Sequence, residues 1–107
     1  MDEKLLVITT LPDRETAERL AGALVGRGLA ACVNIGAPVT SIYRWEGKLE
    51  QGSEHLVTIK TTRRCYAALE SAIVEQHPYE LPEVIAVPIT AGLSGYLAWI
   101  EQCTNDC

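Results

Sequence analysis

The fold is decided by residues 29–61, which read LAACVNIGAPVTSIYRWEGKLEQGSEHLVTIKT. Apolar and β-branched side chains predict one strand over 29–45, interrupted at 36–38, and another over 54–61. The Glu46-Gly47 pair is typical of a hairpin turn, because glycine tolerates the left-handed backbone that such turns need. Strands joined by a direct hairpin are antiparallel, so the stretch disfavours a doubly wound parallel sheet.

The segments on either side of the hairpin repeat one pattern of strand, capped helix and strand. Asp13 is a good N-cap for the first helix, Thr62 is expected to cap the second, and His77-Pro78 is expected to end it. The order βαββαβ, with right-handed crossovers, predicts an α+β, ferredoxin-like antiparallel sheet carrying both helices on one face. The expected elements outside the hairpin are a strand at 5–10, helices at 13–25 and 62–76, a strand at 84–89 and an added C-terminal helix at 94–102.

Length and composition limit the domain count and the class of function. The 107 residues fit a single domain over 1–107, whose tail, 103–107, is expected to fray. Nine Lys and Arg against fourteen Asp and Glu give a charge of −5, which argues against nucleic-acid binding. The longest nearly apolar stretch, 81–93, is shorter than the roughly 20 residues of a membrane span. With no signal-peptide pattern, we expect a cytoplasmic protein without membrane or nucleic-acid partners.

Two further expectations concern assembly and the cysteines. Residues 29–45 would extend roughly 56 Å, whereas a 100-residue domain has a radius of gyration of about 13 Å. The strand must therefore bend at 36–38 or project as an arm, and a projecting arm favours self-association. A cytoplasmic location predicts reduced thiols. The four cysteines are Cys32, Cys65, Cys103 and Cys107.

Five motifs follow one another in order along the chain: LAACVN at 29–34, SIYRWEGK at 41–48, IKT at 59–61, HPYELPE at 77–83 and YLAW at 96–99. Together they resemble the CutA family of divalent-cation tolerance proteins. The resemblance implies a ferredoxin-like protomer, a homotrimer on the plan of PII-type signalling proteins, and a role in tolerance to copper and other divalent metals. In some members a cysteine late in the first strand has been linked to copper, whereas this chain has Thr9 there.

The candidate metal ligands are His77, Glu80 and Glu83, held by a connector that two prolines stiffen. Imidazole suits copper and zinc, and carboxylates can complete such a site. The alternative is structural, with His77 ending the helix and the glutamates solvated. A threonine hydroxyl is a poor ligand for Cu(I), so Thr9 weakens any site that depends on a thiolate there.

A second candidate site is a ligand-binding or inter-subunit cleft formed by Tyr43, Arg44, Trp45 and Lys60. Tyr43 and Trp45 alternate along a strand and share a face, where they either pack on a neighbouring subunit or cradle a ligand. Lys60 is expected to contribute to an anion pocket or to pair with a glutamate such as Glu80.

The sequence thus predicts a homotrimeric protein that binds a divalent cation, copper first, and is not an enzyme. No phosphate loop, His-Glu-x-x-His, nucleophile elbow or Cys-x-x-Cys motif is present. The alternative is a PII-like signalling or scaffold trimer that binds a small anionic ligand or an unidentified partner protein. The short connection at 46–52 weighs against the signalling role, which uses a long mobile loop at that place.

Overall fold

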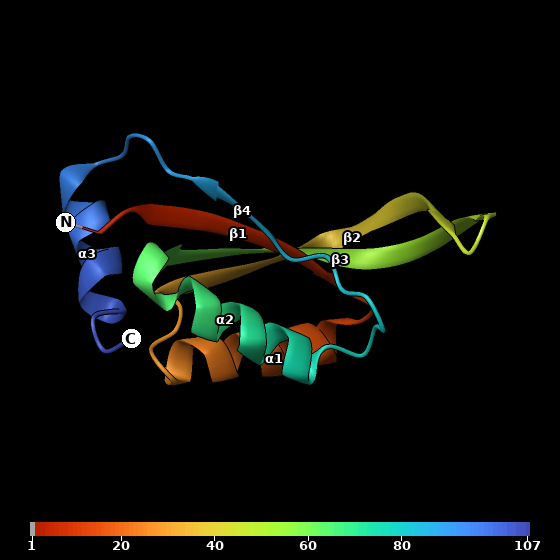
Figure 1. Cartoon of the computed structure of the whole chain (residues 1–107), viewed down its shortest axis with the longest axis horizontal. Coiled ribbons are helices and arrows are strands. Elements are labelled where there is room, and N and C mark those ends of the chain that lie inside the picture. The colour runs from red at the N-terminus through yellow and green to blue at the C-terminus, as the bar shows by residue number, and fades with distance from the viewer. Residues whose placement is uncertain (1) are drawn as a thin grey trace.

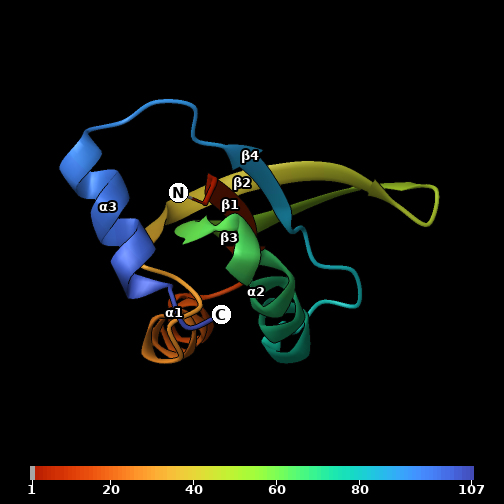
Figure 2. The ribbon, with the colours of Figure 1, turned by 60° about the vertical axis from the view of Figure 1, so that its left-hand side comes forward.

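The structure, a computed structural model that describes residues 2–107, confirms the ferredoxin-like fold class. Four antiparallel strands form one sheet in the order β2-β3-β1-β4. Helices α1 and α2 lie side by side on one face of this sheet, and α3 lies at the end where both termini are found (Figures 1 and 2). The elements are β1 (Lys4–Leu11), α1 (Arg14–Gly26), β2 (Cys32–Trp45), β3 (Lys48–Thr62), α2 (Arg63–Gln76), β4 (Ile85–Pro88) and α3 (Ser94–Cys103).

The hydrophobic core fills the space between the sheet and the two long helices. Alternate residues of β1 and β3 face the helices, as the period of two in a strand requires, and they meet one apolar stripe from each helix. Full burial of a leucine or isoleucine contributes about 1.5–3 kcal/mol relative to exposure. The largest buried apolar side chains in this layer are Leu5, Val7, Leu11, Leu24, Val57, Ile59, Leu69 and Ile73.

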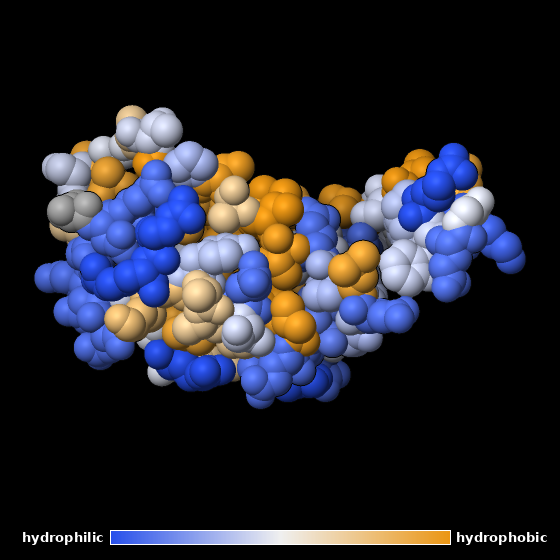
Figure 3. Space-filling model, in the orientation of Figure 1, coloured by the Kyte–Doolittle hydropathy of each residue, from blue (hydrophilic) through white to orange (hydrophobic). Residues whose placement is uncertain are grey.

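The opposite face of the sheet, here called the open face, is covered only at one end. There α3 is anchored to β1 because the Lys4 ammonium, which is buried, pairs with the Glu101 carboxylate. Elsewhere the open face exposes apolar side chains. Figure 3 shows hydrophobic residues gathered in a band across the middle of the molecule and again toward the hairpin end. The large exposed ones on this face and on α3 are Leu56, Ile85, Val87, Tyr96 and Trp99.

The β2–β3 hairpin projects beyond the rest of the molecule as an arm (Figure 1). Strand β3 begins at Lys48, six residues earlier than expected, so the arm is paired almost to its tip. The connection is the two-residue turn Glu46-Gly47, in which both residues have positive φ, 51° and 79°. That geometry is typical of a tight hairpin turn and leaves no mobile loop.

A β-bulge at the base of the arm decides which side chains share a face. Ile35 pairs with Val57, but Pro38 pairs with His55, so β2 contains one extra residue there. Opposite residues in an antiparallel pair point to the same side. A shift by one residue therefore exchanges the two faces of β2 beyond the bulge. Gly36 lies in the bulge, where a Cβ would come within 3.2 Å of the Leu56 carbonyl oxygen.

The C-terminal tail differs from what was expected. Thr104 is fully buried, and its hydroxyl donates to the Ile100 carbonyl oxygen at 2.8 Å. Thr62 makes no side-chain cap and instead donates to the Thr104 hydroxyl at 3.2 Å. Burial of these hydroxyls needs partners, which is why the tail docks at Thr104 rather than fraying.

Two of the four cysteines are not free thiols, which corrects the expectation of a fully reduced chain. Cys65 and Cys107 form a disulfide, because docking of the tail brings their Cα atoms to 5.1 Å. Cys32 and Cys103 remain free.

The expected N-cap of α1 is confirmed. The Asp13 carboxylate accepts a hydrogen bond from the Thr16 amide at 2.8 Å. At the other end of the sheet, Pro88 lies on β4, an edge strand, where the missing amide donor costs no ladder bond.

In the part of the chain that the structure describes, we find no helix with the length and apolar character to cross a membrane.

Candidate acidic cleft

A cleft of 760 Å³ opens between the hairpin arm and residues 78–83, here called the rim segment. It brings together residues from three places in the sequence: the end of β1, the arm, and the connection between α2 and β4. Its lining residues are Thr10, Ser41, Ile42, Tyr43, Trp45, Glu54, Pro78, Tyr79, Glu80, Leu81 and Glu83.

Glu54 lies on β3 within this lining and is held as a carboxylate. Burial by itself would raise the pKa of Glu54, but hydrogen bonding from Ser41, Tyr79 and Thr10 outweighs it and lowers the pKa below the ordinary value. The Thr10 hydroxyl donates at 3.2 Å. Glu54 therefore places a negative charge in the cleft at neutral pH.

The pKa of Tyr79 shifts in the opposite direction to that of Glu54 and lies above its ordinary value. Burial raises the pKa of its phenol, and the neighbouring Glu54 carboxylate raises it further, because a phenolate would lose the hydrogen bond and be repelled by the negative charge. Tyr79 therefore remains a neutral donor over the whole physiological pH range.

His77 occupies a different position from the one expected of a metal ligand. It is buried at the end of α2, where its Nε2 lies 2.6 Å from the Thr10 carbonyl oxygen. The Tyr79 amide donates to Nδ1 at 3.1 Å. With Nδ1 as acceptor and Nε2 as donor, the imidazole is neutral and each of its nitrogens already has a hydrogen-bond partner. To bind a metal, His77 would first have to break one of these bonds.

Glu80 and Glu83 are exposed on the rim segment and line the same cleft as Glu54. The sequence therefore located two of the three carboxylates. Within residues 2–107, no group of three or more His, Cys, Asp or Glu side chains is close enough to enclose a metal ion. A cation in this cleft would accordingly keep much of its water shell.

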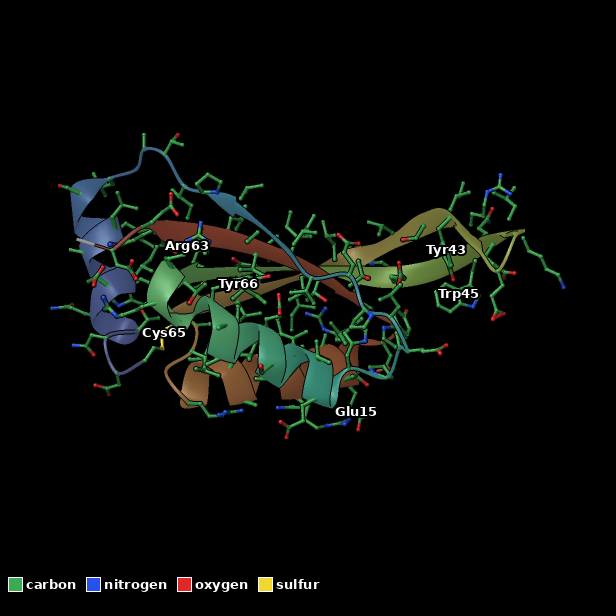
Figure 4. All side chains as sticks on the ribbon, in the orientation of Figure 1. Glu15, Tyr43, Trp45, Arg63, Cys65 and Tyr66 are labelled. Carbon is green, nitrogen blue, oxygen red and sulfur yellow. A yellow bond between two sulfur atoms is a disulfide. The ribbon has the colours of Figure 1, made fainter. Side chains whose placement is uncertain are left out.

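Within a single chain, the residues expected to form a ligand-binding or inter-subunit cleft lie in two places. Tyr43 and Trp45 lie on the arm and line the acidic cleft (Figure 4). Arg44 alternates with them and pairs with Leu49 on the other side of the arm. Lys60 lies near the end of β3, where its ammonium donates to the Asn34 side-chain oxygen. A cleft between subunits that includes Lys60 and Arg44 stays a prediction.

Sequence reasoning missed Glu54, the carboxylate with the most hydrogen-bonding partners in the cleft. Its pairing with Val39 follows only from the bulge, which turns Tyr43 and Trp45 to the same face as Glu54. The signal that could have located it is Gly36-Ala37-Pro38, because glycine and proline within a strand mark bulges.

The lining of the cleft is acidic and aromatic. Three carboxylates and three aromatic rings line it, and lysine and arginine are absent from the described lining. The cleft therefore attracts positive charge and offers oxygen donors of the kind that divalent ions accept.

Comparisons with known proteins agree with this fold over the whole chain. The family model described as CutA1 divalent ion tolerance protein matches residues 5–103. The divalent-cation tolerance protein CutA of Thermus thermophilus is 42% identical over 100 residues, which cover 94% of this chain and 97% of that protein. Protein CutA, chloroplastic, of Arabidopsis thaliana is 42% identical over 102 residues, or 95% of this chain and 56% of that protein. The chain thus spans a little over half the length of the plant relatives.

Solved structures give the same result. The crystal structure of CutA1 from Oryza sativa superposes with a TM-score of 0.95 at 40% identity, covering 99% of this chain and 97% of that one. CutA1 from Shewanella sp. SIB1, described as a stable protein from a psychrotrophic bacterium, gives a TM-score of 0.93 at 46% identity, covering 96% of each chain.

Proposed function

The chain belongs to the CutA1 divalent ion tolerance family, and from that premise we propose that it binds a divalent cation in the acidic cleft as one subunit of a homotrimer. The role is binding rather than catalysis. The observation that carries the proposal is the meeting of Glu54, Glu80 and Glu83 in one cleft whose described lining holds no cationic side chain.

The donor set favours a partly hydrated divalent ion. One or two glutamates bind the ion directly and water fills its other positions, as is common where no complete protein cage exists. Copper, as Cu²⁺, is the first cation to test, since sites with nitrogen and oxygen donors bind Cu²⁺ most tightly among the divalent first-row metals. A site that needs thiolate is not supported, because Thr9 is enclosed in the core.

Titration calorimetry with Cu²⁺, Zn²⁺ and Mg²⁺ tests the cation site. The free thiols of Cys32 and Cys103 are first alkylated, so that they cannot bind or reduce copper. The double variant Glu80→Gln/Glu83→Gln is expected to lose affinity for Cu²⁺ by about tenfold or more, which corresponds to about 1.4 kcal/mol. Glu75→Gln, an exposed carboxylate at the end of α2, is the matched control and leaves the affinity unchanged. Equal affinity in the double variant and the wild type would exclude this cleft.

The homotrimer is supported by apolar surface that a single chain leaves exposed. The open face carries Leu56, Ile85 and Val87, and β2 is a long edge strand along the arm. Apolar patches and unpaired strand edges of this kind are normally covered by another chain. Light scattering after gel filtration tests the stoichiometry, and a monomer at micromolar concentration would contradict it.

The PII-like signalling role has less support. A signalling loop in that position must be long enough to change conformation, whereas Glu46-Gly47 closes the arm in two residues. The arm is therefore better suited to contacts between subunits than to a switch.

A further inference from the structure

The disulfide links two segments that are far apart in the sequence. Cys65 lies in the first turn of α2, and Cys107 lies in the C-terminal tail, 42 residues later. Figure 4 shows Cys65 and a yellow sulfur at the end of the molecule where the tail returns. The bond therefore fixes the tail to the helix layer.

The two cysteines of the disulfide differ in their exposure to solvent. Cys65 is completely buried, whereas Cys107 is an exposed residue. Thiol–disulfide exchange requires an incoming thiolate to reach one sulfur in line with the bond that breaks. Attack is therefore directed to Cys107, with Cys65 as the leaving group.

The surroundings of Cys65 act in two directions on a leaving thiolate. Cys65 is the third residue of α2, within the first turn, where the free amides and the helix dipole favour negative charge. Burial and the Thr104 carbonyl oxygen, 3.1 Å from the sulfur, instead favour a neutral thiol, so Cys65 takes up a proton once the bond has broken. The direction of exchange is therefore set by the difference in exposure between the two cysteines.

We propose that Cys65 and Cys107 form a reversible exchange site for dithiol reductants, and that the bond acts as a latch on the C-terminal tail. A thiolate of the dithiol attacks the Cys107 sulfur, the disulfide breaks, and its electron pair goes to Cys65. The second thiol of the reductant loses its proton, attacks the mixed disulfide and releases Cys107. Two electrons and two protons pass from the dithiol to the protein, which ends with two thiols, and the reductant ends as a disulfide.

Without the disulfide, the tail and the last turn of α3 are held only by noncovalent contacts and open more often, while the domain stays folded. Thr104 keeps its hydrogen bonds to Thr62 and Ile100, and Glu101 keeps its ion pairs with Lys4 and Arg64. The released segment is therefore short. The latch controls the tail and the last turn of α3, which lies at the end of the open face.

The test combines thiol counting with hydrogen exchange on the full chain. Air-oxidised protein, denatured without reductant, is expected to show two thiols, and protein treated in the native state with dithiothreitol is expected to show four. Amides of the tail and the last turn of α3 are expected to exchange about tenfold faster after reduction, while those of β1 and β3 are unchanged. After the dithiothreitol has been removed, re-oxidation with glutathione disulfide, a stronger oxidant, restores both readings.

The variants are made at Cys107, which is exposed, and at Cys103, which is half-buried. A substitution at buried Cys65 is avoided because it could prevent folding. Cys107→Ser shows three thiols in both states, and its tail exchanges at the fast rate throughout. Cys103→Ser, the matched control, keeps the full response with one thiol fewer in each state. Four thiols in the oxidised wild type, a bond that native-state dithiothreitol does not reduce, or equal tail exchange in both states would each overturn the proposal.

Discussion

The Nε2 atom of His77 lies 2.6 Å from the carbonyl oxygen of Thr10, a residue 67 positions earlier in the chain. The same ring accepts from the Tyr79 amide. One imidazole therefore ties the start of the rim segment to the end of β1, and both of its nitrogens have hydrogen-bond partners within the chain.

Replacing His77 with alanine should therefore reduce stability more than cation affinity. The change leaves a buried carbonyl and an amide without partners, which costs about 1–3 kcal/mol. Urea unfolding measures that loss, and Gln76→Ala, on the exposed side of the same turn, is the control. A variant with unchanged stability and no Cu²⁺ binding would instead identify His77 as a ligand.

The low pKa of Glu54 predicts a specific pH dependence of stability. The folded-state pKa lies below the unfolded value, near 4.5, so the contribution is complete above that value and is lost as the pH falls through the folded pKa. The difference in unfolding free energy between the wild type and Glu54→Gln should therefore be largest at neutral pH and shrink in acid. Urea unfolding across the acidic range measures it.

Tyr79→Phe provides an independent check on the same pair. Loss of the phenol removes one of the hydrogen bonds that lower the pKa of Glu54, so that pKa should rise. Carbon-detected NMR titration of the carboxyl group reports the pKa directly. An unchanged value would mean that the Ser41 and Thr10 hydroxyls suffice.

Replacing threonine with valine should change the free energy of unfolding in opposite directions at Thr9 and at Thr61. Both are completely buried, but Thr9 Oγ1 has no hydrogen-bond partner among residues 2–107, whereas Thr61 donates to the Leu29 carbonyl oxygen at 2.6 Å. Thr9→Val should raise the unfolding free energy by about 1 kcal/mol, and Thr61→Val should lower it by about 1–3 kcal/mol. Thermal and urea unfolding distinguish them, and a destabilised Thr9→Val would reveal a partner for this hydroxyl.

The proposed trimer can be tested with two valines of similar exposure. Val87 lies on the open face, and Val74 lies on the solvent side of α2. A charge at Val87 would be buried between subunits without a partner, so Val87→Glu should release monomers. Val74→Glu should leave the mass unchanged. Light scattering after gel filtration gives both masses, and equal masses for the two variants would exclude the open face from the interface.

The sequence predicted the fold because its signals are local. The cap at Asp13, the apolar stripe of α1 and the turn at Glu46-Gly47 are each set by residues close to one another in the chain. The docked tail could not be predicted in that way. It depends on Thr62 meeting Thr104, and on Cys65 meeting Cys107, across about 40 residues.

In the candidate site, too, the sequence carries only local signals. Two prolines mark the segment of Glu80 and Glu83, which line the cleft, and metal binding by these glutamates stays a prediction. Glu54 was missed because its place beside Tyr43 and Trp45 depends on strand register, which a single extra residue changes. The residue type of His77 suits a metal, and only the fold shows that both of its nitrogens have hydrogen-bond partners.

The bulge at the base of the arm lets β2 present residues of opposite parity on one side of the sheet. Before the bulge, Cys32 pairs with Lys60 on the open face, whereas beyond it Val39 pairs with Glu54 on that face. If β2 kept its first register along its whole length, Arg44 would share the face of Glu54 and the two aromatic side chains would turn away. The extra residue thus decides whether aromatic or cationic side chains of the arm share a face with that carboxylate.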